Sequence, residues 1–233
     1  GQSADYKEIN RIARKHNLIV IEDAAQSVSA KFGDKTSGNL ADIACFSLYA
    51  TKNLMCVEGG MVTTNNKDYY EKVKLFRHHG QSETKRYFYH DIGYNYRLSD
   101  LHAAIGLCQF QTLEEMNKKR RSIAKKYDKA LNGMKGIITP YVAPHSKHVY
   151  HQYTLRITED YKHTREEFQN LLLENDIQTN IYYPIPLYEF DHLKMGLRNK
   201  LPVTEKITKQ VVSIPVHPNL SDQDVEKIIK TIK

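Results

Sequence analysis

The strongest constraint on the fold is the run Leu18-Ile19-Val20-Ile21, which is short, continuous and apolar. A helical pattern precedes this run, and Glu22-Asp23 follows it. Four consecutive apolar residues are typical of a parallel strand that is covered on both faces. Because open α/β sheets bind ligands at the carboxyl ends of their strands, the acidic pair stands where a binding site is expected.

Two further segments are interpreted as strands of the same sheet. Ile43-Ala44-Cys45-Phe46 is another buried run, and Gly60-Met61-Val62-Thr63-Thr64 is a third candidate. A parallel sheet of so few strands leaves an apolar edge uncovered, and the first helix has no strand before it. We therefore expect an α/β fold with a mostly parallel sheet, in which this chain is the downstream part of a larger domain.

A long helix is expected from Ser99 or Asp100 to about Leu131, with a bend near Leu113, and the chain is expected to divide after residue 113. Residues 1–113 are expected to form the downstream portion of the large domain, and residues 114–233 a smaller C-terminal α/β domain. In the smaller domain, Thr164 and Glu167 have the spacing of a capping box at a helix start. The other elements expected there are strands near 150–157 and 177–182 and helices near 204–211 and 222–232.

The composition of the chain excludes several classes of protein. At 233 residues, with 40% hydrophobic and 26% charged residues, it is that of a globular protein with a real core. No apolar run is long enough to cross a membrane, and the polar opening Gly1-Gln2-Ser3 shows no signal peptide. The three cysteines lack metal-ligand spacing. We therefore expect free thiols in a reducing cytoplasm and no membrane partner.

The formal net charge of +7 does not by itself indicate a nucleic-acid partner. The densest basic cluster, Lys118-Lys119-Arg120-Arg121, lies on the expected long helix together with Glu114, Glu115 and Asp128, which is typical of a solvated helix face. No nucleic-acid-binding module accompanies the charge, so no nucleic acid is expected. A basic surface also suits a substrate that carries phosphates.

Four features follow one another in the first half of the chain: the acid Asp23, the hydroxyl of Ser47, the amine of Lys52 and the pair Gly59-Gly60. A pyridoxal-phosphate enzyme needs such a set, because a lysine amine captures the cofactor aldehyde while an acid keeps the pyridine nitrogen protonated. Ser47 offers a hydroxyl for a phosphate, and Gly59-Gly60 lets the backbone approach closely. The order predicts carbon–nitrogen chemistry, in which Lys52 also moves a proton at the amino-bearing carbon.

Each of these residues also has an ordinary structural alternative. A strand-end aspartate such as Asp23 commonly caps the following turn, and most lysines are simply solvated. Gln26 can hydrogen-bond the phenolic oxygen of the cofactor ring or serve as a turn amide. His78 and His79, with His90 and His102 further on, fit no standard metal site, so no metal is expected.

A series of short motifs runs along the whole chain. They are Gly1-Gln2-Ser3-Ala4-Asp5, Val20-Ile21-Glu22-Asp23-Ala24-Ala25-Gln26, Phe46-Ser47-Leu48-Tyr49-Ala50-Thr51-Lys52-Asn53-Leu54, Glu58-Gly59-Gly60, Arg77-His78-His79-Gly80, Ile92-Gly93-Tyr94-Asn95-Tyr96-Arg97-Leu98-Ser99-Asp100, Ala103-Ala104-Ile105-Gly106 and Ser213-Ile214-Pro215-Val216-His217-Pro218. In these motifs and their order, the chain resembles the DegT-type family of pyridoxal-phosphate-dependent nucleotide-sugar aminotransferases. The resemblance implies the aspartate aminotransferase-like fold.

The resemblance also implies a role for each matching residue. Lys52 binds the cofactor covalently, Asp23 partners the pyridine nitrogen, and Gln26 lies near the phenolic oxygen of the ring. Ser47 binds the cofactor phosphate. Asn95 reaches the phosphate in the neighbouring subunit's site, which implies a homodimer with shared active sites. The family usually transfers an amino group from glutamate to a keto-sugar linked to UDP, dTDP or GDP, for amino-sugar and polysaccharide biosynthesis.

The sequence departs from the family pattern in two places. Family members begin well upstream of Gly1, with a segment that supplies further cofactor contacts, and Met55-Cys56-Val57 stands where small, polar and Gly residues are usual. Two alternatives to the aminotransferase stay open. One is an inactive or incomplete fragment that dimerises or binds sugar nucleotide. The other is a sugar dehydratase on the same scaffold, which is disfavoured because that branch has a histidine in place of Lys52.

Overall fold

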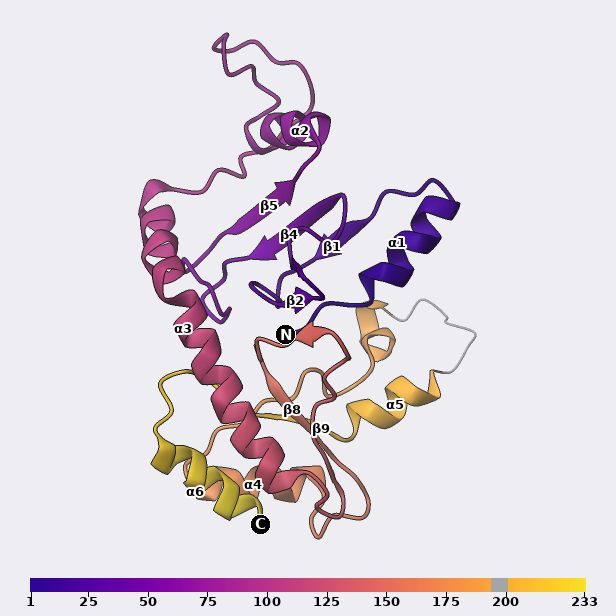
Figure 1. The fold of residues 1–233 in the computed structure, drawn as a ribbon, viewed down its shortest axis with the longest axis vertical. Helices are drawn as coiled ribbons and strands as arrows, with labels where there is room; N and C mark the ends of the chain where they lie inside the picture. Colours follow the sequence, from indigo (N-terminus) through magenta and orange to yellow (C-terminus); the bar gives the residue numbers. More distant parts are fainter. Residues whose placement is uncertain (194–200) are drawn as a thin grey trace. The chain divides into compact units, whose positions relative to one another are not determined.

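The computed structural model describes residues 1–193 and 201–233. Its helices and strands, shown in Figure 1, belong to two compact units. The first unit consists of residues 1–118 and 142–151, and the second of residues 119–141 and 152–233. The domain boundary expected between residues 113 and 114 stays a prediction. None of the described helices is long and apolar enough to span a lipid bilayer.

The first unit is built on a sheet with the strand order β1-β4-β5. β1 (Ile21–Asp23) pairs in parallel with β4 (Ile43–Ser47), whereas β4 and β5 (Gly60–Thr64) are antiparallel. The three expected strands are present, and Asp23 is the last residue of β1. The third strand runs against the expected direction, because the loop of residues 48–59 contains no helix to carry the chain back for a parallel crossover and joins β4 to its neighbour as a hairpin does.

The expectation that the first apolar run is covered on both faces is wrong for the described chain. The strand begins only at Ile21, and Leu18, Ile19 and Ile21 are 61%, 60% and 64% exposed. β1 is an outer strand of its sheet, so it has no partner strand on its free edge among residues 1–193 and 201–233. The opposite face is covered, since Glu22 and Ala44 are buried.

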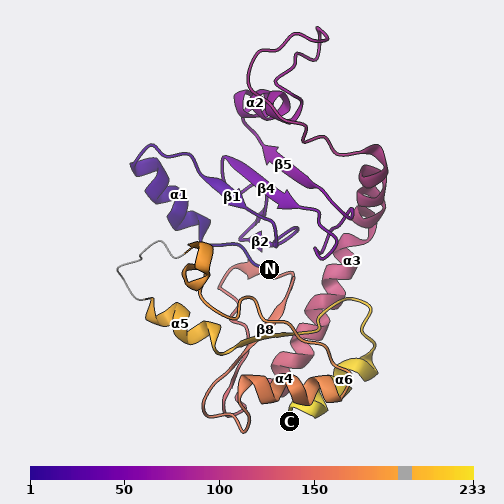
Figure 2. The same ribbon diagram turned by 180° about the vertical axis from the view of Figure 1, so that it is seen from behind.

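Two helices flank this sheet in the first unit. α1 (Tyr6–Lys15) begins at the cap Asp5, whose side chain accepts hydrogen bonds from two amides of the first turn. α2 (Lys67–Arg77) begins at the cap Asn66 and contacts β5. The loop of residues 78–99 then extends beyond α2, away from the sheet, as both ribbon views show (Figures 1 and 2).

Three short strands and part of a long helix complete the first unit. β2 (Lys31–Phe32) pairs antiparallel with β3 (Lys35–Thr36) and with β7 (Ser146–Lys147). The segment that contains β7 therefore returns to the first unit, although it follows part of the second in sequence. The helix α3 (Asp100–Leu131) begins in the first unit and ends in the second.

The second unit contains an antiparallel sheet with the strand order β6-β8-β9. Its strands are β6 (Ile137–Ile138), β8 (Tyr153–Ile157) and β9 (Val211–Ile214). Alternate residues of β8 are buried, which is the pattern of a strand with one face on the core. Its helical elements are α4 (Arg165–Glu174), α5 (Pro202–Thr208), α6 (Asp222–Ile232) and the short 3-10 turns η1 (Leu187–Glu189) and η2 (Asp191–Leu193).

Local sequence signals in the second unit are confirmed better than long-range ones. The capping box at α4 is present, since Thr164 Oγ1 accepts from the Glu167 amide at 3.2 Å and Glu167 Oε2 accepts from the Thr164 amide at 2.8 Å. The strand expected near 177–182 is wrong: only Asn180 forms an isolated bridge there, to Ser213 in β9. Strand pairing depends on a distant partner, whereas a capping box is complete within four residues.

The packing of α4 leads to a prediction about stability. Leu172 is fully buried, whereas its neighbour Leu173 is 63% exposed. Leu172→Ala is expected to lower the free energy of unfolding by about 2–5 kcal/mol, because it removes buried methyl groups and leaves a cavity. Leu173→Ala is expected to change it by less than about 0.5 kcal/mol. Urea unfolding of both variants measures the difference, and equal effects would contradict this assignment of the core.

Candidate active site

The carboxyl end of β1 carries two acids with different surroundings. Glu22 is 1% exposed, and its carboxylate accepts hydrogen bonds from Ser37 Oγ at 2.7 Å and from the Gly38 amide at 2.8 Å. Asp23 points to the other face of the strand and is exposed. Glu22 therefore holds the segment around Ser37 against the sheet, while Asp23 is presented to solvent at the strand end.

Only one of the two carboxylate oxygens of Asp23 has a hydrogen-bond partner in the described part of the chain. Its Oδ1 accepts from the Ala25 amide at 3.1 Å, as in an Asx turn, so the turn-capping alternative is confirmed as one of its roles. The other carboxylate oxygen has no hydrogen-bond partner in the described part of the chain. That oxygen can accept a hydrogen bond from a ligand.

Lys52 lies in the loop that joins β4 to β5. This loop is closed by backbone hydrogen bonds from Leu48 to Gly59 O, from Ala50 to Val57 O and from Cys56 to Leu48 O, at 2.8–2.9 Å. The Lys52 amide donates to Tyr49 O at 2.9 Å. The side chain is half-buried, and its amine makes no hydrogen bond or ion pair within residues 1–193 and 201–233.

The strand register relates the acid to the lysine loop. Asp23 pairs with Cys45 across the parallel β1–β4 ladder, and Ser47 ends β4 two residues further on. Asp23, Ser47 and Lys52 therefore stand at one edge of one sheet, in the order that the sequence predicts. Gln26 follows in the turn after β1 and is exposed.

Asn95 is the predicted site residue that this edge does not include. It lies in the loop after α2, where its backbone forms an isolated bridge with His78. The interactions of the described residues join it to none of the other four predicted site residues. It is exposed, and its role in a neighbouring subunit stays a prediction.

Two neighbours of Asp23 escaped the sequence reasoning. Burial, followed by the charges of Glu22 and Asp23, raises the pKa of the Tyr6 phenol to about 12, so this side chain stays protonated beside the acids. Burial and then the charge of Asp23 also raise the pKa of the Cys45 thiol. The position of Cys45 beside Asp23 could have been predicted from the pairing of the two strands. Tyr6 belongs to α1, and no local pattern in the sequence predicts that it lies near Asp23.

The surroundings of Lys52 include a second set of residues found only in the structure. Lys52 lies near the backbone nitrogen of Gly1, and the Val149 amide donates to Gly1 O at 2.8 Å. Burial lowers the pKa of His148 to about 4, so its imidazole is neutral near pH 7. His148 Nδ1 accepts from the Tyr150 amide at 2.8 Å, and the two rings stack at 4.1 Å.

The departure from the family pattern after Lys52 has a structural consequence. Val57 has φ of 73°, in the left-handed region that a β-branched residue rarely adopts. Its carbonyl nevertheless accepts the hydrogen bond from Ala50 that closes the loop. The sequence therefore keeps the loop conformation at the cost of backbone strain where glycine would avoid it.

The donor set at this edge fits pyridoxal phosphate. An amine without a partner is the group that captures an aldehyde, and a carboxylate oxygen without a partner is the acceptor that a protonated pyridine nitrogen needs. Ser47 Oγ accepts from the Tyr49 amide at 3.3 Å, which leaves its hydroxyl proton to donate to a phosphate. No group of three or more His, Cys, Asp or Glu side chains that suits a metal occurs in the part of the chain that the structure describes.

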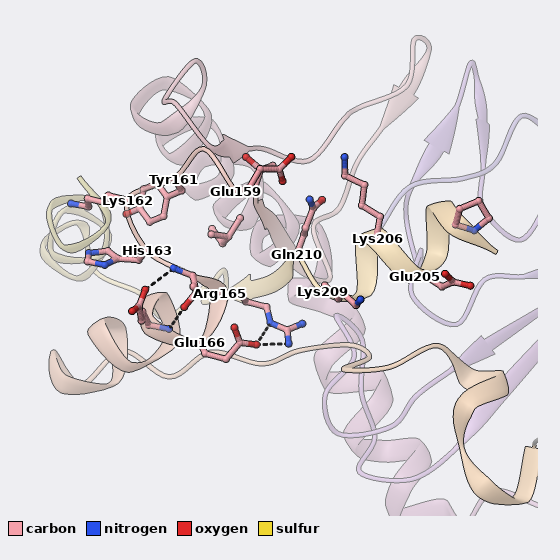
Figure 3. Close-up of a pocket in the computed structure, with 15 residues that line it drawn as sticks. Glu159, Tyr161, Lys162, His163, Arg165, Glu166, Glu205, Lys206, Lys209 and Gln210 are labelled. Carbon is pink, nitrogen blue, oxygen red and sulfur yellow. Dashed lines mark hydrogen bonds and ion pairs between the residues drawn. The ribbon is translucent and has the colours of Figure 1, made fainter. Parts of the chain in front are cut away.

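A cavity of about 690 Å³ lies elsewhere, in the second unit (Figure 3). None of the five predicted site residues lines it. Several of its polar side chains already bond to the chain itself: Arg165 Nη2 binds Glu166 at 2.6 Å, and Tyr161 Oη donates to Ile232 O at 2.6 Å. The edge of the β1-β4-β5 sheet is the better candidate for the active site.

Comparison with known proteins identifies the class. The model of the DegT/DnrJ/EryC1/StrS aminotransferase family matches residues 1–233, and the chain belongs to this family. The expected family and the α/β fold class are thereby confirmed. Members of the family depend on pyridoxal phosphate.

Individual relatives agree with this assignment. The chain is 38% identical over 229 residues to the UDP-2-acetamido-2-deoxy-3-oxo-D-glucuronate aminotransferase of Pseudomonas aeruginosa, covering 98% of this chain and 61% of that protein. It is 38% identical over 235 residues to the dTDP-3-amino-3,6-dideoxy-alpha-D-galactopyranose transaminase of Aneurinibacillus thermoaerophilus. This match covers 100% of this chain and 62% of that protein.

A solved structure shows the same fold. A DegT DnrJ EryC1 StrS aminotransferase from Brucella abortus matches with a TM-score of 0.89 and 30% identity, covering 99% of this chain and 60% of that one. The chain thus spans less than two thirds of the length of each of these three proteins.

The strained loop after Lys52 generates a prediction. Val57→Gly is expected to raise the free energy of unfolding by about 0.5–1 kcal/mol, because relief of roughly 1–2 kcal/mol of left-handed strain outweighs the extra freedom of glycine in the unfolded chain. Val62 is the matched control: the two valines are 44% and 43% exposed, but Val62 lies in β5. Val62→Gly is expected to lower stability by about 1 kcal/mol. Chemical denaturation compares them, and destabilisation by both would contradict the strain.

Proposed function

We propose that the protein carrying this chain is a pyridoxal-phosphate-dependent aminotransferase acting on nucleotide-linked keto-sugars, with glutamate as amino donor. The observation that carries the proposal is the placement of an amine without a partner and a carboxylate with one oxygen unpaired at the carboxyl ends of two neighbouring strands. Asp23 ends β1, and Lys52 follows the neighbouring parallel strand β4. Family membership over the whole chain supports the same reaction class.

Each residue of the site has a stated task in this proposal. When bound, pyridoxal phosphate supplies an aldehyde that a primary amine can capture and a protonated ring that withdraws electrons. Lys52 would hold the cofactor through its amine, and the same amine, when free, would carry the proton between the amino-bearing carbon and the cofactor. Asp23 accepts a hydrogen bond from the ring nitrogen and keeps it protonated. Gln26 donates to the phenolic oxygen, and Ser47 donates to the phosphate.

The substrate class follows from relatives rather than from a pocket. One relative is named for a UDP-linked keto-sugar and another for a dTDP-linked amino-sugar. A keto-sugar joined to a nucleoside diphosphate is therefore the proposed substrate, and the product is an amino-sugar for polysaccharide biosynthesis. The net charge of +7 suits a ligand that carries two phosphates.

We also propose that the protein is a homodimer with shared active sites. The loop that carries Asn95 exposes large apolar side chains, among them Tyr87 at 68% and Ile92 at 75%. At the start of α3, Leu101 and Leu107 are 71% and 68% exposed. Exposed apolar side chains in such numbers are typical of an association surface.

All three cysteines are free, which supports the cytoplasmic location expected from the sequence.

The role of Lys52 is tested by trapping the cofactor. The purified protein incubated with pyridoxal phosphate is expected to absorb visible light, and borohydride is expected to fix one cofactor on Lys52, as peptide mass spectrometry detects. Lys52→Ala should abolish both signals. Lys31→Ala is the control, because Lys31 is an exposed lysine on β2 and should leave the adduct unchanged.

The remaining hypotheses give other results in this experiment. A protein that stays colourless and unlabelled would support the inactive fragment and contradict the proposal. If protein loaded with pyridoxal phosphate but not treated with borohydride is given glutamate and a panel of keto-sugar nucleotides, and dehydrates the sugar without aminating it, the dehydratase is correct instead.

The shared site is tested by mixing subunits. A Lys52→Ala protein and an Asn95→Ala protein, each weak alone, are denatured together and refolded. If Asn95 serves the opposite site, half of the dimers are mixed and one site in each is intact, so roughly a quarter of wild-type activity returns. A mixture no more active than its parents would show that Asn95 does not act across an interface.

A further inference from the structure

Asn53, the residue after Lys52, is held in a buried hydrogen-bond network. It is 6% exposed, and its Nδ2 donates to Asn117 Oδ1 at 2.8 Å and to Val149 O at 2.9 Å. Its Oδ1 lies 3.3 Å from His151 Nδ1. All four residues belong to the first unit. One side chain thus joins the lysine loop to α3 and to the segment that contains β7.

Simple chemistry fixes the orientation of this amide. A backbone carbonyl can only accept, so the Asn53 atom that faces Val149 O is the NH2 group. Asn53 Oδ1 then faces His151, whose Nδ1 must carry a proton to donate to it. Asn117 faces Asn53 with its oxygen. Asn53 therefore uses both of its amide protons and its oxygen in the network.

Apolar side chains anchor the same loop on both sides of the lysine. Leu48, Leu54 and Cys56 are 8%, 5% and 0% exposed and form one core cluster with Leu113 of α3. By contrast, Lys52 bonds to the loop through its backbone, since its amide donates a hydrogen bond to Tyr49 O. The lysine side chain therefore makes no bond of its own in a loop that is anchored on both sides of it.

We propose that Asn53 is a positioning residue that fixes the backbone of Lys52, and so the place at which its amine meets a bound aldehyde. Adjacent Cα atoms are about 3.8 Å apart, so a displacement of Asn53 moves the base of the lysine directly. The lysine stem is flexible, and a shift of about 1 Å in a reacting group can cost about a hundredfold in rate. This inference rests on the proposed function, because Lys52 must be the cofactor lysine.

Asn53→Asp is the sharpest test, because it keeps the size of the side chain and the acceptor for His151 but cannot donate to Asn117 or Val149. The rate at which pyridoxal phosphate becomes fixable on Lys52 by borohydride is expected to fall at least about tenfold. The pH at which the bound cofactor changes its visible absorption is expected to shift. With keto-sugar substrate, kcat is expected to fall while KM stays within about twofold.

Two controls separate positioning from general destabilisation. Asn65→Asp alters an exposed asparagine pair, in which Asn65 Nδ2 donates to Asn39 Oδ1 at 2.7 Å, and should leave every readout unchanged. Leu172→Ala lowers stability in the second unit and should leave the capture rate and the pH profile unchanged. Asn117→Ala removes only one of the bonds of Asn53, so its capture rate should lie between those of wild type and Asn53→Asp. It carries the test if Asn53→Asp does not fold.

The outcomes distinguish this inference from the function on which it rests. If the wild-type protein is not labelled on Lys52, the proposed function fails. If the wild type is labelled and the Asn53 and Asn117 variants capture the cofactor at the same rate and with the same pH profile, only the positioning role is overturned.

Discussion

The parallel pairing of β1 with β4 is the interaction on which the candidate site depends. It joins only three residue pairs, yet it brings the acid at the end of one strand beside the strand that leads to the lysine loop. Two buried networks support it from behind. Glu22 binds the segment around Ser37, and Asn53 binds α3 and the segment near Val149. Without these hydrogen bonds, Asp23 and Lys52 would still be present, but their positions relative to each other would no longer be fixed.

The places of the candidate site residues in the fold were predictable where the sequence signals are local. Asp23 follows an apolar run, and Lys52 follows a second one, so their positions at strand ends can be read from the order of residues. The capping box at α4 is predictable for the same reason. The direction of β5 is instead set by its connection, and the pairing of β9 is set by a distant partner. The antiparallel direction and the strand at Val211–Ile214 were therefore missed.

Long-range contacts explain what the sequence could not show at the site. Asn53 bonds to residues 64 and 96 positions away, and Tyr6 reaches the acids from another element. The exposure of Leu18 and Ile19 was missed for a related reason. An apolar run indicates that a strand is suited to burial. It does not show that another element of the chain packs over it.

The most direct measurement is a crystal structure of the protein grown with pyridoxal phosphate. The account predicts electron density that is continuous from Lys52 Nζ to the cofactor, with the Asp23 carboxylate about 2.7–3.2 Å from the pyridine nitrogen. A cofactor bound elsewhere, or a Lys52 amine and an Asp23 carboxylate too far apart to contact one ring, would contradict it.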